Sequence, residues 1–414
     1  MPPKNAQSIS PPNAEAQFVL TCVAGAIANA SDSDRANRTS ELAAKSLDWN
    51  EVLRIASWHG VIPCVWRFVS LHADAMPESF VAAIRAEFVG NALRNLRLAR
   101  ELARIANALA AMKIGMLALK GPALAIATYG DLAMRQFTDL DILIREPDLP
   151  RVADLLAESG YYPRRYERDR RGGGFFQSSE DEFSSADGRD LIDVHWRLAP
   201  AYFPFAPDEE GLWMRAASVE IEGAHIATLA TTDAMLFVIA HATKHGWPNL
   251  RAICDVAALA AAPSLDWDAL AAQATRLGCG RMFLLGALLA AEITQARVPP
   301  ALVAQARGDP RVARLARRIT DRLFTRIGAR PGLFNEWMVP LGAIEGAANR
   351  IRYGAQRGLR PSVDDWEFFP LPRGLYPLYW IIRPFRLLAA HGPRLFSGAA
   401  RANDSARKRA AVRE

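Results

Sequence analysis

An alternation of acidic and apolar residues occupies positions 138–144 of the chain, Thr138-Asp139-Leu140-Asp141-Ile142-Leu143-Ile144. Side chains of a β-strand point alternately to its two faces. The pattern therefore predicts a strand that buries Leu140 and Ile142 and turns Asp139 and Asp141 to the opposite face. Two carboxylates this close repel each other unless a cation lies between them, and oxygen ligands at this spacing suit Mg²⁺ that carries the phosphates of a nucleotide.

An Asp-x-Asp pair alone is weak evidence, because alternating acids are also common on solvated strands. The order of the neighbouring segments favours the metal interpretation. The apolar run 114–119 predicts a strand, and Lys120-Gly121-Pro122 predicts a tight turn that opens a helix. Backbone N–H groups at such a turn favour phosphate, and Lys120 can neutralise a phosphate oxygen. A later predicted strand, 191–196, brings Asp193 as a third carboxylate, with which two metal ions could be held.

Composition describes an ordinary globular chain of 414 residues, 50% hydrophobic and 23% charged, with material for two or three domains. The formal net charge of +6 permits polyanionic ligands without requiring them. The four cysteines lie far apart without Cys-x-x-Cys spacing, which argues against a disulfide framework or a zinc knuckle and favours a reducing cytoplasm. No stretch approaches the roughly 18 apolar residues that a membrane span needs, so no transmembrane segment is expected.

Patterning along the chain predicts an α+β protein, with helical regions before and after a core that contains strands. Within the α/β core, 161–190 is charged and rich in glycine and predicts a mobile hairpin loop. Segment 371–388 mixes aromatic residues with arginine, which suits either peripheral contact with a membrane surface or docking on the protein itself. The predicted divisions are a disordered leader, 1–14; an N-terminal helical region, 15–110; the core, 111–231; a C-terminal helical region, 232–335; an aromatic and arginine-rich docking segment, 336–393; and a basic disordered tail, 394–414.

A second group of polar residues, His241, Lys244 and His245, shares one face of a predicted helix at i, i+3 and i+4. A zinc site would need a third ligand, and Ala242 stands where a metalloprotease has its glutamate. The remaining interpretations are a polar face that supports the active site, with Lys244 or Arg251 contacting phosphate, or a hydrogen-bonded helix end.

Two single residues also have open interpretations. Arg135 can pair with Asp139 or with a phosphate. His195 shares a strand face with Asp193, so it either orients Asp193 or the acceptor or has a structural role.

Together these motifs resemble the polymerase-β-like nucleotidyltransferase superfamily, and most closely the bacterial group of nucleotidyltransferase family proteins, which is largely uncharacterised. The resemblance spans roughly residues 35–285. The motifs that carry it are Leu119-Lys120-Gly121-Pro122-Ala123-Leu124, Tyr129, Arg135, Asp139-x-Asp141, Gly160-Tyr161, Ile192-Asp193-Val194-His195-Trp196, Trp58-His59-Gly60-Val61-Ile62-Pro63 and His241-Ala242-Thr243-Lys244-His245-Gly246-Trp247.

The resemblance implies a polymerase-β-like core, a small mixed sheet with helices, that is flanked by N- and C-terminal helical regions. It also implies transfer of a nucleoside monophosphate from an NTP to an acceptor hydroxyl of a small molecule, a protein or an RNA, with Mg²⁺ or Mn²⁺ as cofactor. The residues that match or adjoin the family's motifs are Asp139, Asp141 and Asp193 as metal-binding and catalytic carboxylates, and Lys120, Gly121, Arg135, His241, Lys244 and His245 as residues that bind the nucleotide.

One departure from the superfamily concerns the phosphate-binding turn. The usual Gly-Ser turn is here Lys120-Gly121, without the serine hydroxyl. The sequence therefore leaves two alternatives to an ordinary nucleotidyltransferase. One is a catalytically inactive relative that serves as a binding or scaffold protein in a biosynthetic cluster, and the other is a toxin-like enzyme that modifies tRNA.

Overall fold

The structure is a computed structural model that describes residues 13–28, 47–163, 179–263, 265–325, 327–328, 332 and 334–389. The chain divides into two compact units, one of residues 1–164 and 179–346 and the other of residues 165–178 and 347–414. The predicted basic tail and the Arg170–Gly174 segment lie outside the described residues. So does the predicted leader, apart from Asn13 and Ala14, at which helix α1 begins.

The region before the sheet is helical, as the apolar spacing predicts. It contains α1 (Ala14–Ala28), α3 (Trp49–His59), α4 (Ile62–Val69), the short η1 (Ala73–Ala75) and α5 (Glu78–Ala111). Asp48 caps α3, because its side chain accepts hydrogen bonds from the N–H groups of Asn50 and Glu51. The 34 residues of α5 form one continuous helix.

A seven-stranded mixed sheet follows, in the order β3-β4-β5-β2-β1-β7-β6. Strand β2 runs antiparallel to β1 and parallel to β5, and β4 runs antiparallel to β5. Helices α5 and α6 both pack against β2. The strands and the elements between them are β1 (Met116–Ala118), α6 (Gly121–Tyr129), η2 (Leu132–Met134), β2 (Asp139–Ile144), η3 (Glu146–Asp148), α7 (Leu149–Glu158), β3 (Tyr161–Pro163), β4 (Glu180–Ser185), β5 (Leu191–His195), α9 (Glu209–Met214), β6 (Ala217–Ile221) and β7 (Ala224–Thr228).

The register of β2 and β5 sorts their side chains between the core and one polar face. Asp141 pairs with Asp193 in this register. Ile142 and Val194, the next residues along the two strands, are fully buried. The apolar face of both strands therefore belongs to the core. The mixed α+β architecture predicted from the sequence is therefore confirmed.

The expectation of a hairpin over 161–190 is confirmed by an antiparallel strand pair, but the residues that form this pair are strands of the sheet and not part of a loop. The first residues of this range form β3 and residues 180–185 form β4, which pair antiparallel with each other. Strand β4 is hard to recognise in the sequence because Phe183 is its only apolar residue, and the other buried side chain on that side of the strand is the acidic Asp181.

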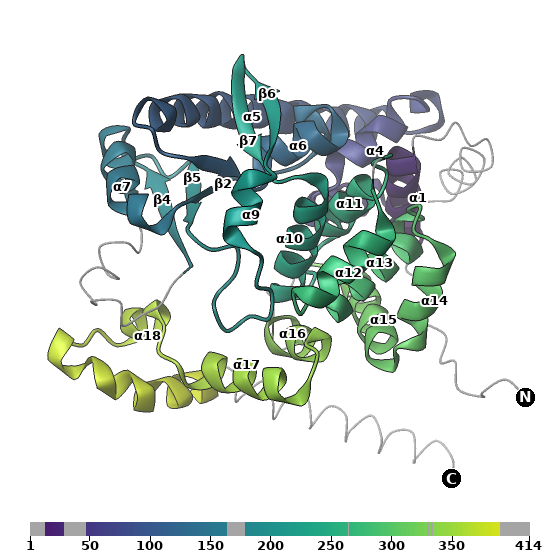
Figure 1. Cartoon of the computed structure of the whole chain (residues 1–414). Coiled ribbons are helices and arrows are strands. Elements are labelled where there is room, and N and C mark those ends of the chain that lie inside the picture. The colour runs from purple at the N-terminus through teal and green to yellow at the C-terminus, as the bar shows by residue number, and fades with distance from the viewer. Residues whose placement is uncertain are drawn as a thin grey trace, which may run out of the picture. The chain divides into compact units, whose positions relative to one another are not determined.

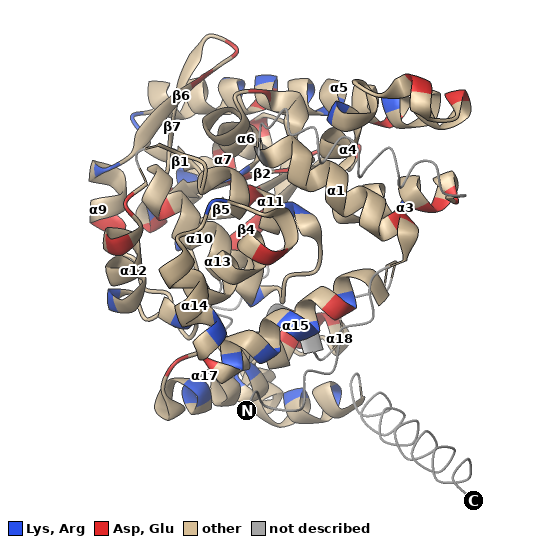
Figure 2. Ribbon diagram, turned by 90° about the vertical axis from the view of Figure 1, so that its right-hand side faces the viewer, with Lys and Arg blue, Asp and Glu red and all other residues tan. Residues whose placement is uncertain are grey.

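Helices return at Thr231 and gather beside the sheet (Figure 1). Within the described residues no helix is long and apolar enough to cross a membrane. Helix α15 buries Val312, Leu315 and Ile319 and presents basic residues on its outer face (Figure 2). The helices of this region are α10 (Thr231–Lys244), α11 (Leu250–Leu259), α12 (Trp267–Arg276), α13 (Gly280–Thr294), α14 (Pro300–Gly308), α15 (Pro310–Thr325), η4 (Phe334–Met338) and α16 (Val339–Ala343).

The second unit contains α17 (Ala347–Leu359), α18 (Val363–Phe368) and η5 (Arg373–Leu378), followed by a helix over residues 379–389. Its small core is formed by Tyr376 and Tyr379, against which Trp366, Leu371 and Ile382 pack.

Candidate functional site

Asp141 lies in the middle of β2 and is almost completely buried. Its backbone carbonyl accepts a hydrogen bond of 2.9 Å from the N–H of Leu119, which fixes the end of β1 beside it. The next residue, Lys120, is the N-cap of α6. Gly121 follows in the left-handed region with φ +57°, and a Cβ there would lie 3.3 Å from the carbonyl oxygen of Asp139. The turn thus brings the start of α6 directly against the start of β2.

The Lys120 ammonium and the Asp141 carboxylate form an ion pair in which Nζ and Oδ1 are 2.6 Å apart. Only 14% of the lysine side chain and 2% of the aspartate side chain are exposed. Burial by itself would raise the pKa of Asp141, but the nearby charges of Lys120 and His195 outweigh it and hold that pKa well below its usual value. Asp141 is therefore ionised near neutral pH.

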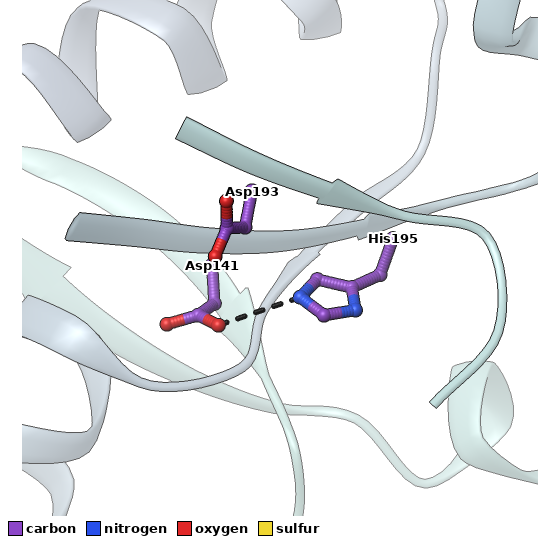
Figure 3. A group of neighbouring side chains, drawn as sticks. All are labelled: Asp141, Asp193 and His195. Atoms are coloured by element: carbon purple, nitrogen blue, oxygen red, sulfur yellow. Dashed lines mark hydrogen bonds and ion pairs between the residues drawn. The ribbon is translucent and has the colours of Figure 1, made fainter. Parts of the chain in front are cut away.

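His195, the last residue of β5, bridges two carboxylates. Its Nε2 lies 3.4 Å from Oδ1 of Asp141 (Figure 3), and its Nδ1 lies 3.1 Å from Oε2 of Glu180 on β4. Burial lowers the pKa of the imidazole, but the two acidic partners raise it more, to about 9. Near neutral pH the ring is consequently a cation held between Asp141 and Glu180.

Asp193 completes a group of three possible metal ligands. Single ligand atoms of Asp141, Asp193 and His195 all lie within 4.8 Å of one another (Figure 3). Burial, followed by the charge of Asp141, raises the pKa of Asp193 to about 7. The carboxylates are thus crowded enough that one tends to keep its proton, and a divalent cation would relieve that repulsion. The two carboxylates therefore fit a metal site, whereas His195 as a cation has no free electron pair for a metal.

Asp139 stands at the start of β2, on the same strand face as Asp141. It is not part of the three-residue group. The predicted set of Asp139, Asp141 and Asp193 is thus brought to one face of the sheet, and His195 is the third member of the close group. Whether Asp139 binds metal stays a prediction.

Helix α10 brings its polar face to the same place. His241 Nε2 lies 3.4 Å from the Lys120 ammonium. Burial and the charge of Lys120 lower the pKa of His241 well below its usual value, so its neutral ring accepts the hydrogen bond from Lys120. Lys244 approaches Glu180, with Nζ 3.7 Å from Oε1, and the His245 ring is centred 4.6 Å from that of His241. The structure therefore links this predicted group to Lys120 and Glu180.

Arg135 has a partner other than the two that the sequence offers. The sequence offers Asp139 or a phosphate as its partner, but in the structure the guanidinium binds Asp255 of α11, with Nε–Oδ1 and Nη2–Oδ2 distances of 2.9 Å. Both side chains are almost completely buried. Arg251, the other predicted phosphate ligand, donates to the carbonyl of Gln136 at 3.1 Å. The Arg135 guanidinium thus forms a buried ion pair with Asp255, and this pair has a structural role.

Glu180 is the site residue that the sequence analysis missed. It pairs with His195 in the register of β4 and β5, and Glu182 pairs with Asp193. The run Glu180-Asp181-Glu182-Phe183 has three consecutive acids and no acidic–apolar alternation, so no local signal identifies it as a strand.

Comparison with known proteins gives one match. A family model described as an uncharacterised nucleotidyltransferase matches residues 45–295, which include every residue of the site described above. No curated protein and no solved structure matches the chain.

Proposed function

The chain belongs to a family of uncharacterised nucleotidyltransferases, and on that premise we propose that it transfers a nucleoside monophosphate from an NTP to an acceptor hydroxyl and releases pyrophosphate. The observation that carries the proposal is the register of β2 and β5, which sets Asp141 opposite Asp193 beside the Lys120 turn. In the reaction a bond forms between the acceptor oxygen and the α-phosphorus, and the bond from that phosphorus to the pyrophosphate breaks.

Asp141 and Asp193 are the proposed ligands of Mg²⁺ or Mn²⁺, with Asp139 as a further carboxylate from the same strand face. When bound, such a cation neutralises charge on the phosphates and makes the acceptor hydroxyl more acidic. Oxygen donors from two adjacent strands suit these metals. His195 is a proposed positioning residue, because its charged ring fixes the orientation of the Asp141 carboxylate.

Lys120 and the first N–H groups of α6 are the proposed phosphate-binding elements. The start of the nine-residue helix α6 favours a negative charge. Lys120 lies within reach of both Asp141 and His241, and its ammonium would contact a phosphate oxygen if Asp141 held a metal ion. Asp193 receives the proton of the attacking hydroxyl. The protein thereby acts mainly by positioning and by charge neutralisation.

The compartment is a further proposal. All four cysteines are free and buried in the structure. Free thiols of this kind are usual where the surroundings are reducing, and we propose the cytoplasm.

The test is calorimetric titration of each NTP, with and without Mg²⁺ or Mn²⁺, into the wild type and the Asp141→Asn variant. Binding that depends on metal and is lost in Asp141→Asn supports the proposal, and an α-labelled nucleotide then identifies the acceptor. Asp190→Asn is the matched control, because Asp190 lies just before the neighbouring strand β5 but pairs with Arg97. Metal-dependent binding that survives Asp141→Asn would refute the assignment.

A second candidate function, a binding or scaffold protein without catalysis, has one observation in its favour. The resident ammonium of Lys120 already neutralises the carboxylate that a metal would need. If Lys120 has replaced the metal, no NTP binds the wild type under any condition, and Lys120→Met exposes a metal site that the wild type lacks. For the enzyme, Lys120→Met instead weakens a nucleotide binding that the wild type shows.

A further inference from the structure

Helix α15 presents four arginines on its outer side, here called the arginine row: Arg311, Arg314, Arg317 and Arg318. All four residues are exposed, and basic positions are visible along this helix in Figure 2. At about 100° per residue, the four lie within roughly a third of the circumference of the helix and span about 10 Å along its axis. The buried residues Val312, Leu315 and Ile319 lie on the opposite side. The row is therefore one continuous basic surface.

No described carboxylate forms an ion pair with the arginine row. Within the part of the chain that the structure describes, the side-chain hydrogen bond of the row is that of Arg317, whose Nε donates to the carbonyl of Ala313 in the same helix at 3.3 Å. Asp309, just before α15, is occupied otherwise, because it binds Nε of Arg281 at 2.9 Å and accepts from the N–H of Arg311 at 2.8 Å. The four positive charges of the row therefore lack a compensating charge among the described residues.

The arginines of α5 show that exposure alone does not leave an arginine without an acidic partner in this protein. Arg97 Nη1 lies 2.5 Å from Oδ1 of Asp190, and Arg100 Nε lies 3.0 Å from Oε2 of Glu222. These two arginine side chains are 46% and 66% exposed. The arginine row differs from them in its charge balance, so its charges repel one another and an anionic partner would relieve that repulsion.

The surroundings of the row indicate which kind of anion it fits. A series of like charges along one line suits a polyanion with repeated phosphates, and a guanidinium can bind a phosphate through two N–H groups at once. A helix that binds a membrane surface also needs large apolar side chains on its outer side. Helix α15 exposes none, because its large apolar residues face the protein core. The row therefore suits a nucleic acid better than a bilayer.

The packing of α15 distinguishes between kinds of nucleic acid. Helices α13, α14 and α16 contact α15, so only its outer side is accessible. A helix that reads duplex DNA lies inside the major groove, which is about 12 Å wide and hardly wider than a helix with its side chains. The helices around α15 would block such an entry. Single-stranded RNA and the wide, shallow minor groove of duplex RNA can instead be contacted from one side.

We propose that the arginine row binds the phosphate backbone of RNA. The contact is electrostatic and independent of base sequence, because the row contains no side chain other than arginine with which to read a base edge. The proposal concerns α15 alone and goes beyond the proposed nucleotide transfer, so either proposal can fail without the other.

The experiment is fluorescence anisotropy of a labelled oligouridylate of roughly 30 nucleotides, titrated with the full-length chain at several salt concentrations. Four phosphate contacts contribute a slope of about −2.8 to the logarithm of the association constant against the logarithm of salt, which is roughly a fiftyfold loss between about 50 and 200 mM. Changing all four arginines of the row to Gln should remove this contribution. Arg314→Gln/Arg318→Gln should remove about half of it and serves as the test if the fourfold variant fails to fold.

Two controls separate the row from general charge. Arg97→Gln/Arg100→Gln makes the same change of charge on the exposed side of α5 and should leave the slope as in the wild type. Arg314→Lys/Arg318→Lys keeps the charges and should also keep the slope. The proposal is overturned if the wild type does not bind the oligouridylate, or if Arg314→Gln/Arg318→Gln flattens the slope no more than the α5 control does. It is also overturned if duplex DNA of the same length binds more tightly than RNA, since the partner would then be DNA.

Discussion

Replacing Arg135 by Met is expected to destabilise the larger unit strongly while leaving nucleotide binding intact. The sequence motif places Arg135 among the nucleotide ligands, but the structure commits its guanidinium to Asp255 through two contacts of 2.9 Å. Its carbonyl oxygen is also fixed, because Asn95 donates to it at 2.7 Å. Stability and binding therefore separate the two interpretations of this residue.

The magnitude follows from the burial of the pair. The Arg135 side chain is 5% exposed and that of Asp255 is 3% exposed. In Arg135→Met the carboxylate would keep only the hydroxyl of Tyr129, at 3.1 Å. Removing one partner of a buried ion pair costs about 3–5 kcal/mol, because the other charge stays buried without compensation. In a unit of this size the melting temperature should fall by roughly 5–15 °C.

The assay is thermal unfolding of the wild type, Arg135→Met, Asp255→Leu and the variant that carries both changes. The double variant should lose less stability than the sum of the single losses, because it buries no unpaired charge. Arg145→Met is the control: the Arg145–Glu210 pair is 47% and 62% exposed, so it should cost at most about 1 kcal/mol. A single-variant loss of less than about 1 kcal/mol would refute the reasoning. If Arg135→Met folds but no longer binds metal and nucleotide, Arg135 is a residue of the substrate site instead.

Two further predictions concern a buried histidine of α3 and the glycine of the Lys120 turn. Burial lowers the pKa of His59 to about 4. Between pH 6.5 and pH 4 the unfolded chain therefore binds a proton that the folded chain does not bind. The free energy of unfolding thus falls by up to about 3 kcal/mol as the pH drops to 4. The difference between the melting temperatures at pH 7.5 and pH 5 should therefore be smaller in His59→Leu than in the wild type. An equal difference in the two proteins would contradict the lowered pKa of His59. Gly121→Ala should cost about 1–2 kcal/mol for its left-handed backbone and should weaken nucleotide binding, because the new Cβ meets Asp139. Gly130→Ala, with φ +70° and nothing within 4 Å of its Cβ, should pay only the backbone cost and bind nucleotide normally.

The sequence predicts the central strands of the site because their signals are local. The alternation around Asp141 and the apolar run around Asp193 identify two strands, and the structure confirms both and sets the two residues opposite each other. Helix α10 is also predicted, since His241 and Lys244 share one helical face.

What the sequence does not reveal is which distant side chains meet. Arg135 and Asp255 are 120 residues apart, and nothing local to Arg135 distinguishes a carboxylate partner from a phosphate. Glu180 escapes for a different reason, because its strand lies at the end of a charged, glycine-rich stretch whose composition resembles a loop.

The place of β1 in the sheet has a consequence for the growing polypeptide. Strand β1 pairs with β2 soon after it in the chain, but its other neighbour is β7, where the Thr228 hydroxyl donates to the Ala118 carbonyl across 110 residues. Pairings this distant close late in folding. A chain on the ribosome that has not reached residue 228 therefore leaves one edge of β1 open, and at that edge an unfinished copy can pair with another and aggregate.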